Sequence, residues 1–194
     1  MLDPAADRVL FGKVGWMKSY DGVRPGDPAP TNGGEYNRTQ GIGAEVVNFR
    51  KQDGFYYGYF RPKNASRVSL ERIEPILPRV PREVTSVDGV TVVWVAPHSD
   101  GGVYPVGWYR EATVYRSFQH HPTPVRHPDL DDDDHVFICR TAVANGHLIA
   151  EEDRLDWPRV RTTGAGAMGQ TNHRFPRYSP DSWDWVKPIL KRIP

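Results

Sequence analysis

The chain has 194 residues and a net charge of +1, with 11% aromatic residues and 18 residues each of Gly and Pro. This length suits one domain with a sizeable core, and the many Gly and Pro residues indicate short elements joined by tight turns. No stretch approaches the length of about 18 apolar residues that a membrane span needs, and the opening residues MLDPAADRVL include acidic groups. We therefore expect neither a membrane span nor a secretory signal, and we place the protein in the cytoplasm.

Charge is distributed unevenly along the chain. Residues 1–82 contain 13 basic and 9 acidic side chains. Residues 83–160 contain 6 basic and 13 acidic side chains, and residues 161–194 contain 6 basic and 2 acidic ones. Basic ends around an acidic middle are compatible with a nucleic-acid-binding face, and a merely solvated surface explains the pattern equally well.

The first third of the chain predicts two strands separated by a long loop. Residues 9–20, VLFGKVGWMKSY, have strand composition, and the Gly- and Pro-rich stretch 21–34 that follows is a loop of the length that usually serves a function. The aromatic run 55–60, FYYGYF, predicts a strand in which Gly58 allows a bulge or a close backbone approach.

A hairpin is expected at the centre of the fold. Residues 90–95 and 103–109 are two runs of strand composition, and residues 99–102, SDGG, can close them into an antiparallel pair. The second run contains Gly107-Trp108-Tyr109, which echoes Gly15-Trp16-Met17. We expect the two tryptophans to reach one region of a β-barrel core.

The remaining elements are short. Residues 68–73 predict a strand or a turn of helix, and Asn145-Gly146 predicts a turn between two strands, 136–144 and 146–149. A short helix is expected over 151–157, ended by Pro158, and another from Ser182 toward Leu190, interrupted by Pro188 and forming a cap on the fold or the start of a linker.

The sequence contains none of the motifs of the common enzyme or metal classes. Cys139 is the only cysteine and is expected to be a buried thiol, while His120, His121, His127 and the acidic run 129–134 lack a recognisable ligand spacing. The stretch 164–172, GAGAMGQTN, departs from a phosphate loop because Gln170 stands where lysine is required. We expect no catalytic residue, no metal and no cofactor.

Aromatic and amide side chains recur beside Gly-rich bends, interleaved with basic residues. Aromatic faces can stack on a nucleobase while amides and carboxylates bind its edge, and basic side chains hold phosphates. An aromatic-rich structural core explains the same residues without any ligand.

Five segments together resemble the N-terminal reader region of bacterial modification-dependent HNH restriction endonucleases, which is similar to EVE domains of the PUA-like superfamily. They are GKVGWMKSYDG, GGEYNRTQGIGAEVVNF, YGYFRP, VVWVAPHSDGGVYPVGWYREATVYR and GAGAMGQTN, and they span residues 9 to 175. The resemblance implies an α+β fold, a PUA-like, EVE-type β-barrel flanked by short helices. It also implies a pocket for a flipped base from duplex DNA, commonly 5-methylcytosine or 5-hydroxymethylcytosine. We expect a reader domain over residues 1–178 and a capping helix or linker start over 179–194.

One departure from this family concerns catalysis. The chain ends too soon after Trp185 for an HNH module, so we expect it to bind DNA without cutting, with a nuclease domain or subunit as a possible partner. The alternatives are a reader of modified RNA, a base-flipping nuclease or glycosylase, and a protein-interaction module.

The candidate site residues follow from the resemblance and from side-chain chemistry. Glu45 stands out because a carboxylate can accept a hydrogen bond from the exocyclic amine of cytosine. The candidates for the base pocket are Trp16, Tyr36, Asn37, Glu45, Asn48, Phe49, Trp94, Trp108, Tyr109, Gln170 and Asn172. The candidates for contacts to the DNA backbone are Lys13, Lys18, Arg38, Arg50 and Lys51.

Overall fold

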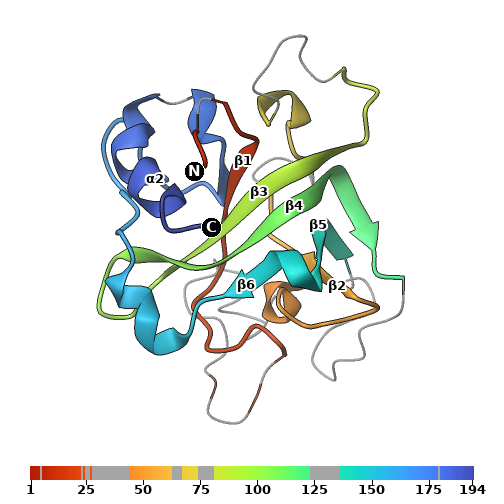
Figure 1. The fold of residues 1–194 in the computed structure, drawn as a ribbon, viewed down its shortest axis with the longest axis horizontal. Helices are drawn as coiled ribbons and strands as arrows, with labels where there is room; N and C mark the ends of the chain where they lie inside the picture. The colour runs from red at the N-terminus through yellow and green to blue at the C-terminus, as the bar shows by residue number, and fades with distance from the viewer. Residues whose placement is uncertain are drawn as a thin grey trace.

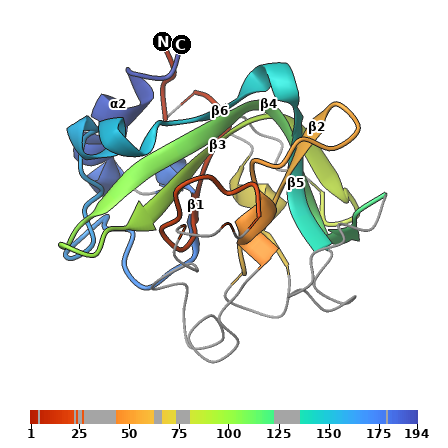
Figure 2. The same ribbon diagram turned by 90° about the horizontal axis from the view of Figure 1, so that it is seen from below.

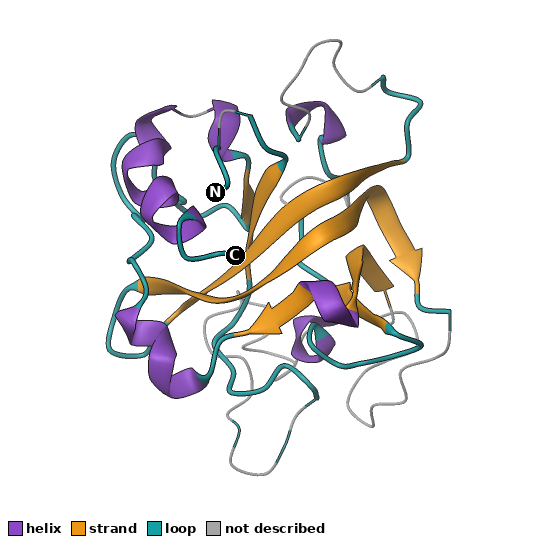
Figure 3. Ribbon diagram, viewed as in Figure 1, coloured by secondary structure: helices purple, strands orange, loops and turns teal. Residues whose placement is uncertain are grey.

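A computed structural model describes residues 1–4, 6–22, 24, 27, 44–62, 67–73, 81–122, 136–178 and 180–194. Its strands form one seven-stranded sheet in the order β2-β5-β4-β3-β1-β7, with β6 paired to β4 beside this path (Figure 1). The architecture is mixed α+β, as predicted, with a dominant sheet and short helices around it (Figure 3).

The predicted hairpin is confirmed as the centre of the sheet. Strand β3 (Ser86–Pro97) pairs antiparallel with β4 (Val103–His120). Its residues 90–96 are all buried, because both faces of this part of the sheet are covered. Gly101 and Gly102 close the hairpin with φ values of 95° and 96°, a conformation that favours glycine.

Strand β1 (Val9–Lys13) is shorter than the run of residues 9–20 predicted. It pairs in parallel with β3 and antiparallel with β7 (His173–Arg174). Pairing with β3 continues for one more hydrogen bond, from the Val14 amide to the Val95 carbonyl at 3.0 Å. The strand is followed by a loop, residues 15–20, in which side chains rather than a neighbouring strand bind the backbone groups.

The predicted turn at Asn145-Gly146 and the strands on either side of it are confirmed, but the two strands do not pair as a hairpin. Strands β5 (Val136–Ala142) and β6 (Gly146–Leu148) each pair with β4 and not with one another, and the turn η4 (Val143–Asn145) connects them. Strand β4 is 18 residues long and has a positive φ of 48° at Glu111. The two parts of β4 on either side of Glu111 therefore pair with different strands along the edge opposite β3, the first with β6 and the second with β5.

The sheet curls without closing. Strand β2 (Phe55–Gly58) pairs with β5 at one end of the strand order, and β7 stands at the other. Phe60, just beyond β2, lies 5.3 Å from His173 of β7 and 6.2 Å from Trp94, measured between ring centroids. The two ends thus face a shared core, but the described strands show no β2–β7 pairing that would complete the predicted barrel.

The helical elements are short and lie at the periphery. Helix α2 (Trp183–Leu190) continues through Pro188, where an interruption was predicted, because Trp185, Val186, Ile189 and Leu190 pack as one stripe against the sheet. No helix in the described part of the chain is long and apolar enough to cross a membrane. The short 3-10 helices are η1 (Ala44–Val47), η2 (Leu70–Arg72), η5 (Glu151–Asp156), η6 (Pro176–Tyr178) and η7 (Pro180–Ser182).

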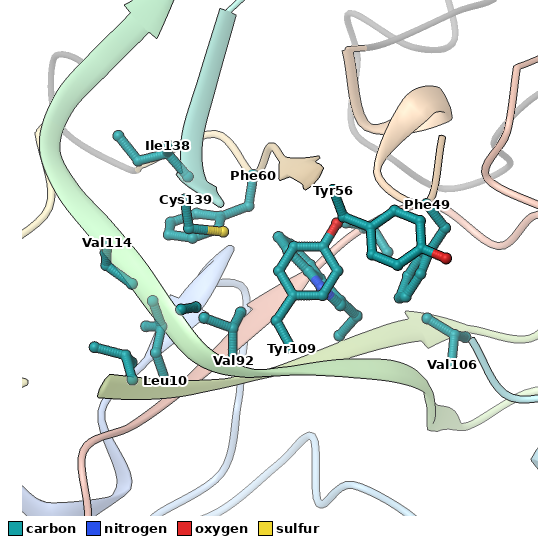
Figure 4. Close-up of a cluster of buried hydrophobic side chains, with 14 of the residues drawn as sticks. Leu10, Phe49, Tyr56, Phe60, Val92, Val106, Tyr109, Val114, Ile138 and Cys139 are labelled. Carbon is teal, nitrogen blue, oxygen red and sulfur yellow. The ribbon is translucent and has the colours of Figure 1, made fainter. Parts of the chain in front are cut away.

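The sheet separates two hydrophobic cores. Alternation along β3 sends Val92 and Trp94 to the larger core, inside the curl, and Val93 and Val95 to the smaller core under α2. Figure 4 shows the larger core, where Cys139 is buried as predicted. Burial raises the pKa of its thiol well above the ordinary value, so Cys139 is a core residue and not a reactive thiol.

Gly58 is the close backbone approach that the aromatic run predicted. A Cβ atom at this position would lie 2.4 Å from the Trp94 ring and 2.8 Å from both Cys139 Sγ and Tyr109. We expect Gly58→Ala to lower the free energy of unfolding by about 1–3 kcal/mol, because the core must shift to admit the methyl group.

The measurement is urea unfolding of this variant beside Gly54→Asn. A Cβ at Gly54 would meet nothing within 4 Å, and asparagine tolerates its φ of +83°. Equal stability of the two variants would contradict the tight packing at Gly58.

Candidate nucleic-acid interface

Two loop segments from different parts of the chain form one unit beyond the end of β1. The Gly22 amide donates to the Val46 carbonyl at 2.9 Å, and the Phe49 amide donates to the Tyr20 carbonyl at 2.8 Å. Figure 2 shows the red segment after β1 beside the orange turn η1. This pairing brings together seven sequence-predicted candidates: Trp16, Lys18, Glu45, Asn48, Phe49, Arg50 and Lys51.

Side chains fix the first of these segments, residues 15–20. The Tyr20 hydroxyl donates to the Gly15 carbonyl at 2.6 Å and accepts from the Met17 amide at 3.3 Å. The buried carboxylate of Asp27 accepts from the amides of Lys18 and Ser19 at 2.8 and 3.1 Å, and from the Ser19 hydroxyl at 2.9 Å. The segment is therefore held in one conformation although it belongs to no strand or helix.

A fully buried arginine lies beneath this segment. The Arg154 guanidinium donates to the carbonyls of Ile149, Met17 and Lys18 at 3.0, 2.5 and 2.7 Å. Its central carbon lies 5.2 Å from the ring centroid of Trp16 and 5.8 Å from that of Tyr20. Burial lowers the Arg154 pKa, a sign of how poorly solvated this charge is. We call Arg154 and its three carbonyl partners the arginine clamp.

Trp16 lies at the edge of the core rather than at its centre. It is 7% exposed, with Arg154 against its ring and His98 of the β3–β4 loop in edge contact, 4.6 Å between centroids. Lys18 points outward, with 66% of its side chain exposed and its amine 4.0 Å from Glu151. The segment thus carries a mostly buried aromatic ring and, two residues later, a solvated positive charge.

Glu45 is a buried carboxylate in η1, only 6% exposed. Its charge contributes to raising the pKa of Tyr20, an effect smaller than that of burial. Three ionisable groups, Glu45, Asp27 and Arg154, are therefore buried around the same tyrosine. Burying charges is costly, and such concentrations of them occur preferentially at functional sites.

Asn48 has a structural partner. Its side-chain oxygen accepts from the Tyr59 amide at 2.8 Å, and its side-chain nitrogen donates to the Tyr59 carbonyl at 3.0 Å. This pair of bonds fixes the chain just beyond β2 to η1. An amide that is used in this way is not available to read a base edge without disrupting the fold.

Phe49 and Tyr109 are buried in the larger core beneath the two segments. The Tyr109 hydroxyl donates to the Asn48 carbonyl, and the two rings meet at 5.3 Å with the Tyr56 ring beside them (Figure 4). Tyr109 is 0% exposed and Phe49 6% exposed. They support the two segments from inside the larger core.

Two of the candidates for the base pocket, Trp94 and Trp108, lie outside the two paired segments. Trp94 is fully buried at the centre of the larger core, with its ring against Tyr109 and Phe60. Trp108 lies in the smaller core, where it stacks on His147 at 4.3 Å. Because Trp108 and Tyr109 are consecutive on β4, their side chains point to opposite faces of the sheet. The structure does not bring Trp16 and Trp108 to one region, contrary to the expectation from their similar motifs.

A second group of predicted residues gathers at the carboxyl end of β1. The Lys13 amide donates to the Asn172 carbonyl at 2.7 Å and its amine to the Gly169 carbonyl at 3.2 Å, with Gln170 exposed beside them. The last three candidates, Tyr36, Asn37 and Arg38, lie outside the described residues.

Sequence reasoning missed the arginine clamp and Asp27. The one available signal was that Arg154 is the only basic residue in EEDRLD, a turn with four acidic residues. Within the described residues, no three His, Cys, Asp or Glu side chains come together as a metal site. No family model, no curated protein and no solved structure matches the chain.

Proposed function

We propose that this protein binds duplex DNA containing a modified cytosine, 5-methylcytosine or 5-hydroxymethylcytosine, and holds the flipped base at the interface formed by residues 15–22 and 44–51. One observation supports this most. These two segments are hydrogen-bonded to one another and together carry a buried carboxylate, aromatic rings and positive charges.

Each part of this arrangement suits a step in base recognition. A buried carboxylate such as Glu45 is an acceptor for the exocyclic amine of cytosine, and the poorly solvated setting strengthens that bond. Trp16 belongs to the same segment and is 7% exposed, and an aromatic face stacks on any base. Together they distinguish a cytosine by its edge after it has left the helix.

Positive charges on the same two segments suit the phosphate backbone. Lys18 and Lys51 are exposed and Arg50 is half-buried. Contacts from these side chains to phosphates would provide the sequence-independent part of the affinity, whereas Glu45 and Trp16 would provide the preference for the modified base.

The proposal extends to fold family and cellular role. A curled sheet around an aromatic core, with short helices outside, is compatible with the EVE-type barrel of the PUA-like superfamily that the sequence resembles. In this role the protein is a non-catalytic specificity module for modification-dependent restriction. A nuclease domain or subunit would be its partner.

The test is a titration of the protein with one duplex in three forms: plain, methylated at cytosine and hydroxymethylated at cytosine, all at the same stated salt concentration. We expect tighter binding to a modified form and intact strands after incubation with magnesium. Equal affinity for all three forms would refute the reader function. A preference for modified RNA over the DNA panel, or strand cleavage, would favour the alternatives instead.

A further inference from the structure

A Gly-rich segment, residues 164–172, lies against the carboxyl end of β1 and is held by basic side chains. Three of its alternate carbonyls accept hydrogen bonds from cations, two of which flank the segment while the third lies at the end of β1. These pairs are Arg161 with Ala165, Arg174 with Ala167, and Lys13 with Gly169.

The stretch of sequence around Arg161 and Arg174 is basic, with acidic residues at 151–156 before it and at 181 and 184 after it. Residues 157–180 contain four arginines and no Asp or Glu. Arg161 binds Asp184 at 2.8 Å. Burial lowers the pKa of Arg174, and the neighbouring charge of Arg161 lowers it further, while burial alone lowers the pKa of Lys13. Like charges held together in partly buried positions cost free energy, which a bound anion would offset.

The backbone of the segment is accessible. Gly164 and Gly169 have φ values of +85° and +61°, and a Cβ atom at either position would meet nothing within 4 Å. A ligand can therefore approach this part of the main chain closely. Lys13 uses one of its three ammonium donors on Gly169, which leaves others for an incoming oxygen.

The segment is also close to the proposed base site. Strand β1 ends at Lys13, and three residues later the chain reaches Trp16. A polymer lying across Trp16 would thus pass a second group of positive charges in addition to Lys18, Arg50 and Lys51. Phosphodiester oxygens are the anions that recur along such a polymer.

We propose that Lys13, Arg174 and the open backbone around Gly169 bind phosphate groups of the DNA backbone next to the flipped base. The identity of the polymer in this inference rests on the proposed function. These groups would give the DNA backbone a second, sequence-independent set of contacts. Lys13 precedes Trp16 in the chain, whereas Lys18 follows it.

The experiment measures the dependence of binding on salt concentration for Lys13→Gln and Arg174→Gln, with both plain and modified duplex. Glutamine keeps an amide donor for the segment carbonyls but removes the charge. We expect each variant to lower the slope of log K against log salt by about one unit for both duplexes, and to keep the wild-type preference between them. Lys191→Gln, which removes an exposed charge at the end of α2, is the control and should keep the wild-type slope.

Several outcomes would overturn this assignment. One is a wild-type slope in both glutamine variants; another is the absence of DNA binding by the wild type. Lys13→Arg, which keeps the charge, must retain the wild-type slope, so a loss there would indicate a folding effect and also count against the site. Replacing chloride by inorganic phosphate at constant ionic strength separates the two sources of phosphate. A wild-type slope in Lys13→Gln, together with inorganic phosphate that binds the wild type but not this variant, would assign the site to a free phosphate instead.

Failure of the proposed function would look different. Equal affinity for plain and modified duplex, together with lower slopes in Lys13→Gln and Arg174→Gln, would refute base reading and leave the phosphate surface intact.

Discussion

Replacing Arg154 by methionine is expected to lower the free energy of unfolding by about 3–5 kcal/mol. Methionine fills much of the same space but leaves the carbonyls of Ile149, Met17 and Lys18 without their buried donor, and each lost partner costs about 1–3 kcal/mol. Removing the charge itself recovers part of that cost, because Arg154 is poorly solvated. The remaining loss is a large part of the stability of about 5–15 kcal/mol typical of a domain.

Urea unfolding followed by tryptophan fluorescence measures this effect. Arg159→Met is the matched control, because Arg159 is exposed and, among the described residues, lies over the ring of Tyr104 alone, at 5.8 Å. We expect the control to change stability by less than about 0.5 kcal/mol. The stability of Arg154→Lys should fall between those of the two methionine variants. The single ammonium nitrogen of lysine cannot reach all three carbonyls, which the arginine contacts through three separate nitrogens. If Arg154→Met were as stable as the control, the clamp would contribute nothing to the fold.

The central strands could be predicted because their signals are local. The runs 90–95 and 103–109 are rich in β-branched and aromatic residues, and the residues between them allow the positive φ that closes a hairpin. The same local logic gave the turn at Asn145-Gly146 and the strands on either side of it, but not their partners. Each strand pairs with a different part of the β4 edge opposite β3, and a turn signal contains no information about a third strand.

The candidate site was predictable in part for a similar reason. Trp16 and Lys18 belong to the run 9–20, which was predicted as a strand, and Glu45 and Arg50 follow a Gly-rich bend. The structure places these two segments in contact. Side-chain direction was not available from composition, so Trp108 was grouped with Trp16 although it faces the other core.

The buried charges show a second limit of sequence reasoning. Two of the three polar partners of Arg154 are main-chain carbonyls more than 100 residues away, at Met17 and Lys18. Any residue type has such carbonyls, so no pairing of opposite charges along the sequence could reveal the clamp. Asp27 is hidden in the same way, because it accepts from the amides of Lys18 and Ser19. Contacts to the backbone require the tertiary structure before they can be inferred.

Replacing Trp16 by leucine is expected to abolish most of the preference for modified duplex. Leucine keeps an apolar contact with the core but removes the ring on which a flipped base would stack, a contribution of about 1–3 kcal/mol, or about 5- to 150-fold in affinity. Binding to plain duplex should persist, because phosphate contacts supply most of the non-specific affinity. Paired titrations with plain and modified duplex measure both quantities on one protein sample.

Trp108→Leu is the control that separates recognition from packing. Trp108 has the same 7% exposure as Trp16 but belongs to the core under α2, on the other side of the sheet. Both substitutions remove a similar amount of buried ring, so we expect comparable losses of stability, of the order of 2–4 kcal/mol, in urea unfolding. At temperatures where both variants remain folded, only Trp16→Leu should lose the preference for modified over plain duplex. A folded Trp16→Leu that still discriminates, or a folded Trp108→Leu that does not, would move the base site away from the segment that Arg154 holds.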